Sequence, residues 1–428
     1  MAGQLKEKVI DWPLQIARRT KVEQSVNQAN HQTMLTRIRK LWRLFSYFIH
    51  ARKTWHWPRQ SDVLIYDADG HEFMSEYLDP WKPAVLHMRG EQINMPVLLA
   101  SLAASGQLSR DSYIDQFVRK VCPRLIVTFI DNDPAFYSLA VRHQNVKTLF
   151  IQNGVKSYYL DVFEILDRTR SSRNSLRVDY MMTFGSRPGA EYAKYIQGTV
   201  VPMGSLRNNL VPKCHAKKAG TIAFISQYRE TKGFVMGGKF CSRQAFFEQA
   251  DQLVLSCLVK YAKDHGKEFF IVPCSGYLKD GTLKKEQEYY NKLLGQACCF
   301  SEWRWHGSSY EAADSAEVLV TIDSALGYES AARGNKTAFF AIKSRLLDVP
   351  GLTYGWPKTP PDEGTFCTNC PNPVVFERIL DHLFAINDEQ WHAELAEHGF
   401  ASIMAYDPGN TILQSVLRKE LGEPSHDC

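Results

Sequence analysis

The sequence predicts an α/β protein with two domains, each built on a parallel β-sheet and both facing a central cleft. Two stretches, 125–154 and 318–340, carry this prediction because they repeat one pattern. Each has an apolar β-branched run, a polar turn, a helix and a second apolar run. This alternation is typical of parallel sheets, whose ligands bind beyond the carboxyl ends of the strands. We therefore expect one ligand-binding edge in each domain.

The composition is that of an ordinary globular protein. The 428 residues are 44% hydrophobic and 23% charged, which allows two or three domains with large cores. A net charge of +5 is small for this length, so it predicts no general affinity for nucleic acid. No apolar run is long enough to span a bilayer, and the first residues lack the apolar core of a signal peptide. We expect a cytoplasmic protein with reduced cysteines and no metal, because Cys367-x-x-Cys370 has no matching second ligand pair.

The N-terminal segment, 1–60, is predicted to form basic amphipathic helices. No acidic residue occurs from Gln24 to Ser61, and apolar residues recur at spacings of three and four from Met34 onward. Basic and aromatic residues on such a helix suit contact of residues 34–59 with an anionic membrane. The alternative is a helix packed on the protein with a solvated basic face, and the sequence leaves both open.

Four further segments follow. The first domain is expected at 61–211, and a polar, basic linker at 212–220 separates it from a second domain at 221–372. Helices that close the fold are expected at 373–428. Within the first domain the predicted strands lie at 62–66, 85–88, 125–130, 148–151, 180–184 and 198–201, and within the second at 221–225, 269–272, 318–322 and 337–340.

Polar side chains follow three predicted strands of the first domain. A charged group at a strand end suits a ligand site, although Arg89 and Glu91 also suit a structural ion pair, and Asp133 before Pro134 also suits a helix N-cap. Among these residues, Asp131 is the one that we expect to take part in the reaction. The residues in these positions are Arg89, Glu91 and Asn94, then Asp131, Asn132 and Asp133, and finally Gln152 and Asn153.

In the second domain, small residues begin the helix that follows the strand ending near Asp323. The backbone N–H groups at a helix N-terminus bind anions such as a nucleotide phosphate. Ser324 adds a hydroxyl, and Glu329 is spaced to accept hydrogen bonds from a ribose. The alternative is that Ser324 only caps the helix and Glu329 lies at the surface. Other candidate donor-binding residues are Ser226, Arg229, Gly327 and Lys336.

Two motifs of nucleotide-binding proteins are missing or incomplete. Gly233-x-x-x-x-Gly238-Lys239 matches most of a phosphate-binding P-loop, but Phe240 stands where a Ser or Thr must hold magnesium. We expect a flexible loop beside the cleft instead. There is no G-x-G-x-x-G turn, which argues against a nicotinamide or flavin enzyme.

The order of these features resembles a GT-B glycosyltransferase, which implies two Rossmann-like domains. The resemblance covers about residues 60 to 345 and extends to bacterial proteins of capsule and O-antigen biosynthesis. The segment from Ser324 to Gly334 is also similar to transferases that use CMP-activated Kdo. The strings that carry the resemblance are Arg89-Gly90-Glu91-x-x-Asn94, Val127-Thr128-Phe129-Ile130-Asp131-Asn132, Ile151-Gln152-Asn153-Gly154 and Asp323-Ser324-x-Leu326-Gly327-Tyr328-Glu329-x-x-Ala332-Arg333-Gly334.

The resemblance implies a metal-independent transferase without a cofactor. The second domain is expected to hold the nucleotide-sugar donor, and the first a glycan or lipid-linked glycan acceptor. Asp131 is expected to act as general base, or as nucleophile in a retaining reaction, with Glu91 and Asp133 as further candidate carboxylates. Arg89, Asn94, Asn132, Gln152 and Asn153 are expected to bind the sugars. Two other classes stay open: a sugar-nucleotide epimerase or hydrolase, and a non-catalytic assembly protein.

Overall fold

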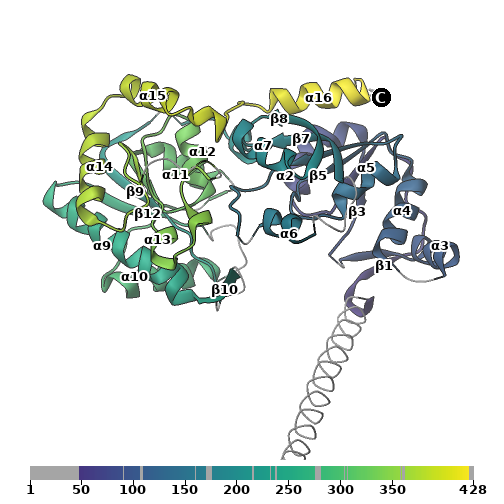
Figure 1. Ribbon diagram of the computed structural model, residues 1–428, viewed down its shortest axis with the longest axis horizontal. Coiled ribbons are helices and arrows are strands. Elements are labelled where there is room, and N and C mark those ends of the chain that lie inside the picture. The colour runs from purple at the N-terminus through teal and green to yellow at the C-terminus, as the bar shows by residue number, and fades with distance from the viewer. Residues whose placement is uncertain are drawn as a thin grey trace, which may run out of the picture. The chain divides into compact units, whose positions relative to one another are not determined.

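The computed structural model describes residues 48–423, apart from 90, 107–108, 160, 170–175, 215, 232, 237–238, 275–280, 303, 306, 357 and 359–361. The chain forms two compact units (Figure 1). The first comprises Met1–Pro58 and His87–Phe117, and the second comprises Arg59–Leu86 and Val118–Cys428. The predicted helices at 1–47 lie outside the described residues.

The first unit is small and contains one two-stranded parallel sheet. Strand β1 (Arg52–Thr54) pairs with β4 (Gln92–Asn94), which leads directly into helix α3 (Met95–Ser105). Asn94 begins this helix, because its side chain accepts a hydrogen bond from the Val97 N–H at 3.1 Å. Helix α4 (Arg110–Val121) starts in this unit and continues into the second one.

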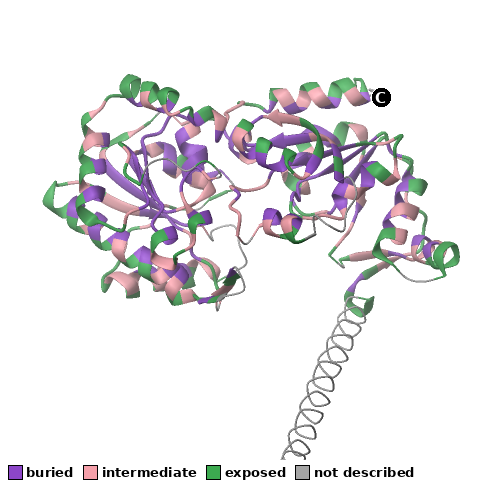
Figure 2. Ribbon diagram, in the orientation of Figure 1, coloured by how far each residue is buried: buried purple, intermediate pink, exposed green. Residues whose placement is uncertain are grey.

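The second unit contains two parallel sheets, and the first of them has six strands in the order β3-β2-β5-β6-β7-β8. Its central strands have no exposed face, since Val63–Tyr66 and Leu125–Thr128 are buried throughout (Figure 2). Burial on both faces is the reason that these strands are continuous apolar runs. The strands are β2 (Val63–Tyr66), β3 (Ala84–Leu86), β5 (Leu125–Thr128), β6 (Lys147–Ile151), β7 (Leu176–Thr183) and β8 (Ile196–Pro202).

Helices cover both faces of this sheet. Leu149 and Ile151 point to one face, where they share an apolar cluster with residues of α2 (His71–Leu78) and α16 (Thr411–Leu421). Phe150 points to the other face and packs against Tyr192, with ring centroids 5.0 Å apart. Helix α16 therefore returns to the first sheet from the end of the chain. The other helices here are η1 (Asp79–Trp81), η2 (Phe136–Ser138), α5 (Leu139–Arg142), α6 (Val162–Thr169), α7 (Ser186–Ala193) and α8 (Leu206–Leu210).

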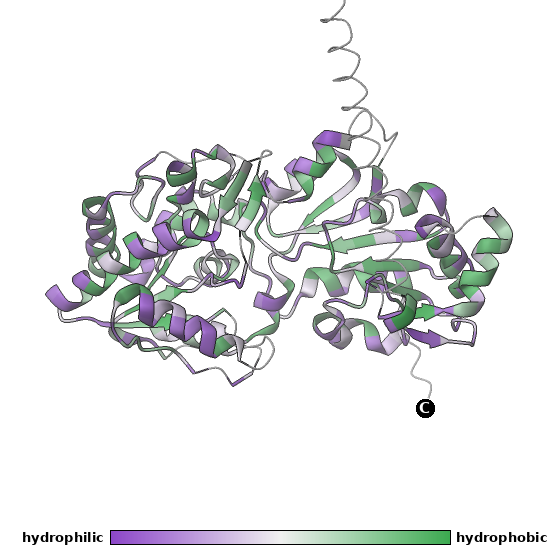
Figure 3. Cartoon of the chain, turned by 90° about the horizontal axis from the view of Figure 1, so that it is seen from below, coloured by the Kyte–Doolittle hydropathy of each residue, from purple (hydrophilic) through white to green (hydrophobic). Residues whose placement is uncertain are grey.

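The second sheet has five parallel strands in the order β12-β9-β13-β14-β15. Side chains alternate between its two faces: Ile222 and Phe224 belong to the large apolar cluster with α9 and α14, while Ala223 and Ile225 pack with Ala313 of α11. Both sheets are hydrophobic in their strands (Figure 3). The elements are β9 (Lys218–Ile225), β12 (Glu268–Val272), β13 (Ala316–Thr321), β14 (Thr337–Phe340), β15 (Cys367–Thr368), α9 (Gln249–Asp264), α10 (Thr282–Leu294), α11 (Ser308–Ser315), α12 (Ala325–Ala332), α13 (Lys343–Leu347), η4 (Pro350–Leu352), α14 (Pro373–Ala385), α15 (Asp388–Glu397) and η5 (Phe400–Ser402).

The predicted fold class is confirmed: the protein is a GT-B-type α/β protein with two Rossmann-like parallel sheets. One local expectation was wrong. The segment that resembles a P-loop is an antiparallel hairpin of β10 (Gly233–Met236) and β11 (Lys239–Ser242), not a loop. The five segment boundaries stay a prediction. No helix in the described part of the chain has the length and hydrophobicity that a membrane span requires.

Candidate functional site

The strand order of the second sheet defines where a ligand fits. From β9 the chain passes to β12 on one side and then returns to β13 on the other side of β9. In open parallel sheets, ligands bind at such a reversal, beyond the carboxyl ends of the two strands. Gln227 follows β9 and Asp323 follows β13, so both lie at this edge. In the first sheet the reversal falls between β2 and β5, where Asp133 accepts a hydrogen bond from the Tyr66 hydroxyl at 2.8 Å.

A buried lysine joins the two strand ends of the second sheet. The Lys343 ammonium lies 2.7 Å from Gln227 Oε1 and 3.1 Å from Asp323 Oδ1. It also lies 4.6 Å from the centroid of the Phe246 ring, which is part of a π-helical turn, Gln244–Glu248. This ammonium neutralises Asp323 beside the start of α12. Sequence reasoning missed Lys343, and its position just after a strand end was the available signal.

A second carboxylate lies behind this lysine. Asp251 of α9 is fully buried, and its carboxylate accepts a hydrogen bond from the Tyr289 hydroxyl at 2.9 Å. Burial raises the pKa of Asp251 to about 6, although the Lys343 ammonium acts in the opposite direction. The charge of this carboxyl therefore changes between mildly acidic and neutral pH.

Helix α12 begins at the same edge with its N–H groups uncapped. Ser324 is the N-cap residue and has an extended backbone, but its hydroxyl accepts no hydrogen bond from the helix. Its own N–H donates to Thr321 Oγ1 at 3.0 Å. Gly327 brings the helix close to β13, because a Cβ there would be only 2.4 Å from Thr321 Cγ2. The Gly327 N–H donates to the Ser324 carbonyl at 3.1 Å, so Ala325 and Leu326 supply the first-turn N–H groups that are available to an anion.

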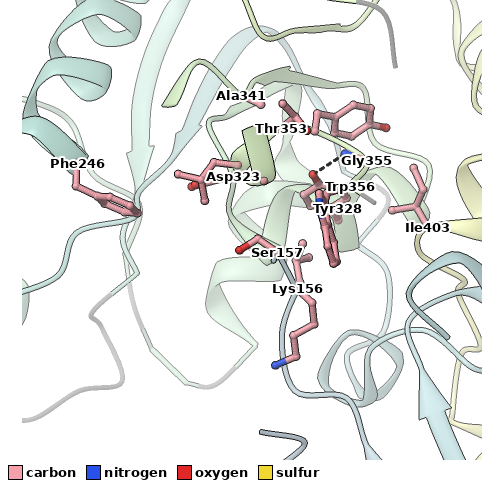
Figure 4. A pocket seen from close by; sticks show the side chains of 14 residues that line it. Lys156, Ser157, Phe246, Asp323, Tyr328, Ala341, Thr353, Gly355, Trp356 and Ile403 are labelled. Carbon is pink, nitrogen blue, oxygen red and sulfur yellow. Dashed lines mark hydrogen bonds between the residues drawn. The ribbon is translucent and has the colours of Figure 1, made fainter. Parts of the chain in front are cut away.

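A pocket of about 160 Å³ opens beside this helix (Figure 4). Figure 4 shows Asp323 at the end of β13, Tyr328 of α12 and Ser157 of the segment after β6 around this pocket. The volume equals roughly five water molecules, below the roughly 300–1,000 Å³ of pockets for drug-sized ligands. The pocket as described is therefore too small for a ligand of that size. The lining residues are 155–157, Phe246, Asp323, Tyr328, Ala341, 351–356 and Ile403.

Lys156 connects the pocket to a buried carboxylate cluster at the end of the first sheet. Its ammonium points away from the pocket in Figure 4 and lies 2.9 Å from Asp131 Oδ1 and 3.3 Å from Asp161 Oδ1. The Tyr192 hydroxyl donates to Asp131 Oδ2 at 2.7 Å, and the Tyr137 hydroxyl donates to the Asp131 carbonyl. These contacts fix the loop that carries Lys156.

The pKa values in this cluster reflect burial and charge together. Burial lowers the pKa of Lys156, but the Asp131 and Asp161 carboxylates more than compensate, so its pKa lies above the ordinary value. Burial raises the pKa of Asp161 despite the nearby Lys156 ammonium. Lys156 is therefore a permanent cation at physiological pH. Sequence reasoning missed Lys156, although it lies only two positions beyond Gly154, the last residue of the string Ile151-Gln152-Asn153-Gly154.

Asp131, the expected general base, has no exposed surface. Both of its oxygens are occupied by Lys156 and Tyr192, so a sugar does not reach them in this conformation. Our expectation that this carboxylate faces the donor sugar does not fit the described geometry. The contacts instead suit a residue that positions Lys156.

The other predicted residues of the first sheet have separate places. Asp133 is partly buried and accepts a hydrogen bond from the Ala135 N–H at 3.1 Å. This bond fits the alternative that Asp133 caps the following helical segment. Gln152 is buried and serves the backbone, since its amide accepts from the Phe184 N–H. Asn153 accepts a hydrogen bond from Lys156 at 3.3 Å, and Asn132 is exposed.

Arg89, Glu91 and Asn94 belong to the other compact unit. Arg89 and Glu91 are exposed, and the Glu91 carboxylate accepts a hydrogen bond from the Arg89 N–H at 3.2 Å. The Asn94 side chain caps α3 and donates to the His56 carbonyl at 2.8 Å. Its role in the described structure is that of a helix cap.

Three predicted donor-binding residues lie away from the pocket lining. Ser226 is buried, with its hydroxyl 2.9 Å from that of Tyr290. Glu329 is buried, accepts a hydrogen bond from the Tyr310 hydroxyl at 3.0 Å, and has its pKa raised by burial. Lys336 donates to the carbonyl of Ile386 at the end of α14. These contacts within the protein account for the positions of the three side chains without a ligand. Arg229 is exposed, and only Asp323 among the predicted charged residues lines the pocket.

The described residues contain no group of three or more His, Cys, Asp or Glu side chains that could hold a metal ion. The charged groups at the two strand edges are instead paired lysines and carboxylates.

Three known structures have a partial likeness to this chain. The wall teichoic acid polymerase TagF, with CDPG, is 12% identical over 85% of this chain and 89% of that one, with a TM-score of 0.43. Sucrose-phosphate synthase from Thermosynechococcus elongatus is 12% identical over 85% and 99%, with a TM-score of 0.46. The S. aureus MnaA–UDP structure is 11% identical over 85% and 98%, with a TM-score of 0.47. Likeness at this level carries no argument about activity.

Sequence comparison identifies the family of this chain. Residues 149–421 match the family described as "putative O-antigen biosynthesis protein", and the chain belongs to this family. The match includes the second sheet and the last three strands of the first one. No curated protein matches the sequence.

Proposed function

We propose that the protein is a glycosyltransferase that moves a sugar from a nucleotide-sugar donor to a surface-polysaccharide or lipid-linked glycan acceptor. Membership of the O-antigen family supports a role in surface glycan synthesis. The observation that carries the proposal is the uncapped start of α12 at the strand reversal between β9 and β13. Uncapped N–H groups at such an edge suit a nucleotide phosphate.

The donor diphosphate or monophosphate would bind at the first turn of α12. Lys343 would balance Asp323, so that the edge presents the N–H groups without a net negative charge. Arg229 is exposed and is our candidate for a further phosphate contact. We also keep Ser324 as a hydroxyl donor, because its side chain does not cap the helix.

The acceptor side of the reaction rests on the first sheet. We propose that Asp131 acts through Lys156, by fixing the segment 155–157 that lines the pocket. Asp133 and Glu91 remain our candidates for the proton-transferring carboxylate. Arg89, Asn132 and Asn153 are proposed to contact sugar hydroxyls or a sugar carboxylate.

We propose that the donor is CMP-Kdo or a related ulosonic acid, on the resemblance of 324–334 to transferases that use it. We also propose metal-independent transfer at the inner face of the cytoplasmic membrane. The basic segment 34–59 would then contact anionic lipid near a lipid-linked acceptor.

Nucleotide binding is the first test. A nucleotide that binds only the native protein raises its melting temperature, so CMP, UDP, GDP and their sugars are compared by thermal shift. A response to CMP supports the ulosonic-acid donor. A response only to UDP or GDP contradicts that donor but keeps the transferase. No response to any nucleotide contradicts the proposed function and favours a non-catalytic assembly protein.

The helix start is tested by Ala325→Pro, which removes one N–H at the first position of α12. Ser324 already has the extended backbone that a following proline requires, so the helix should remain. A lost hydrogen bond to phosphate, about 1.5–3 kcal/mol, should weaken nucleotide binding about 10- to 150-fold by calorimetry. Asp388→Pro, at the first position of α15 after an equally extended Asn387, is the matched control. Equal affinity of Ala325→Pro and the control would place the phosphate elsewhere.

A further inference from the structure

Helix α3 exposes two of its leucines and buries Ser101. Its sequence, MPVLLASLAAS, contains no charged residue, yet only Val97 and Ser101 are buried. Leu99 is 58% exposed and Leu102 is 41% exposed. Met95, Leu99 and Leu102 are spaced at i, i+4 and i+7, which places them in one stripe along the helix. A helix that only stabilises its own unit would have the reverse arrangement.

The inner face of α3 explains which side is free. The Ser112 hydroxyl of α4 donates to the Ser101 carbonyl at 3.3 Å, so α4 lies against the serine face. The Ser101 hydroxyl donates within the helix to the Leu98 carbonyl at 2.8 Å. The serine face is therefore satisfied within the unit. The leucine stripe on the opposite face has no cover from described residues of this unit (Figure 2).

Two tryptophans extend this surface beyond the start of α3. Thr54 lies opposite Asn94 in the β1–β4 pair, so the residues after β1 run beside the first turn of the helix. Trp55 is 67% exposed and Trp57 is 51% exposed. Large exposed apolar groups gathered on one surface mark an interaction site rather than ordinary surface. Tryptophan in particular is enriched at the interface between membrane and water.

Charge decides between a lipid and a protein partner. Arg52 is exposed and Lys53 is partly exposed beside the tryptophans, and residues 24–61 contain no acidic group. Protein interfaces surround an apolar centre with polar groups of both signs, whereas an anionic bilayer favours an apolar face with basic flanks. The leucine stripe carries no charge, and the tryptophan-bearing segment 52–57 is basic and contains no acidic residue. The exposed acidic residues Glu91 and Asp111 belong to the same unit but lie outside the stripe and that segment.

We propose that α3 and Trp55–Trp57 form a docking surface for an anionic phospholipid bilayer. The leucine stripe enters the boundary between headgroups and acyl chains, the tryptophans lie at headgroup depth, and Arg52 and Lys53 meet the lipid phosphates. Only α3 is additional to the 34–59 segment, which already contains Arg52, Lys53, Trp55 and Trp57; α3 lies some forty residues further along the chain. The docking surface does not depend on sugar transfer, because lipid binding requires no donor.

The full chain is tested by flotation with vesicles of phosphatidylglycerol and phosphatidylethanolamine, and with phosphatidylcholine vesicles for comparison. Wild-type protein should float with the anionic vesicles and much less with phosphatidylcholine. Leu99→Glu with Leu102→Glu should lower the bound fraction at least about tenfold, because it introduces two charges into the stripe. Both side chains are exposed, so an unchanged melting temperature is expected and should be verified.

The matched control is Val141→Glu with Val374→Glu, which adds the same charges at exposed valines of the second unit. The control should bind as wild type does. Equal binding of the Leu99/Leu102 variant and wild type would overturn the proposal and leave any membrane contact to segment 34–59. Absence of wild-type flotation would also overturn it. A change from dimer to monomer in light scattering, without lipid binding, would assign the stripe to a second copy of the chain.

Discussion

Breaking the ion pair between Asp131 and Lys156 should lower the free energy of unfolding by several kcal/mol. The two charges are 2.9 Å apart, and their side chains are 0% and 6% exposed. At an effective dielectric constant of about 20, their attraction is about 6 kcal/mol, most of which offsets the cost of burying them. Removal of one partner from a buried pair typically costs about 3–5 kcal/mol. Asp161 still contacts Lys156 at 3.3 Å, so we expect the lower end, about 3 kcal/mol, for Asp131→Asn.

A double-mutant cycle measures this pair. Asp131→Asn and Lys156→Met should each lower the melting temperature by about 6–12 °C, at about 2–4 °C per kcal/mol for a domain of this size. The double variant should lose clearly less than the sum, because it leaves neither member of the pair charged without its partner. Thermal melting followed by circular dichroism supplies the three values. Additive losses would refute the assigned ion pair, and with it the proposal that Asp131 positions Lys156. Lys218→Met, which removes an exposed pair with Glu268, should change the melting temperature little and is the control.

Three further outcomes are expected. Burial raises the pKa of Asp251 from 3.8 to about 6, so the native state loses about 3 kcal/mol of stability as the pH rises from below 3.8 to above 6. Asp251→Asn should therefore have a higher melting temperature than wild type at pH 8 and a similar one at pH 4. Equal gains in melting temperature at both pH values would contradict this assignment. Arg333 pairs with Asp314 at 2.6 Å with both side chains fully buried, so Arg333→Met should lower the free energy of unfolding by about 3–5 kcal/mol. Arg333→Lys should not restore this stability, because lysine cannot make the two parallel hydrogen bonds of the guanidinium to Asp314. Full stability of the lysine variant would argue against these paired hydrogen bonds. Gly327→Ala should cost about 1–3 kcal/mol by overpacking against Thr321, with partial recovery in the Thr321→Ser background, and an unaffected melting temperature would show that the helix start shifts freely.

The order of elements follows from the sequence because parallel strands buried on both faces must be continuous apolar runs. The runs at 125–130, 221–225 and 337–340 contain one threonine each and no charged residue, and each contributes a strand of a sheet. Asp131 and Ser226 follow the first two of these runs. Helix α3 is the contrast, because its apolar composition does not indicate that Leu99 and Leu102 are exposed.

Residue types by themselves determined that Asp131, Asp323 and Ser324 stand at strand ends, since that depends only on local pattern. Only the tertiary structure decided which charges meet there. Lys156 and Lys343 are unremarkable lysines in the chain, and each becomes a buried cation because carboxylates distant in sequence, Asp131 and Asp323, lie about 3 Å away. Glu329 and Lys336 show the converse, since the packing of α11 and α14 places both in the interior. Burial and charge pairing act through space, so a one-dimensional pattern predicts the edge of the sheet but not the electrostatics of the site on it.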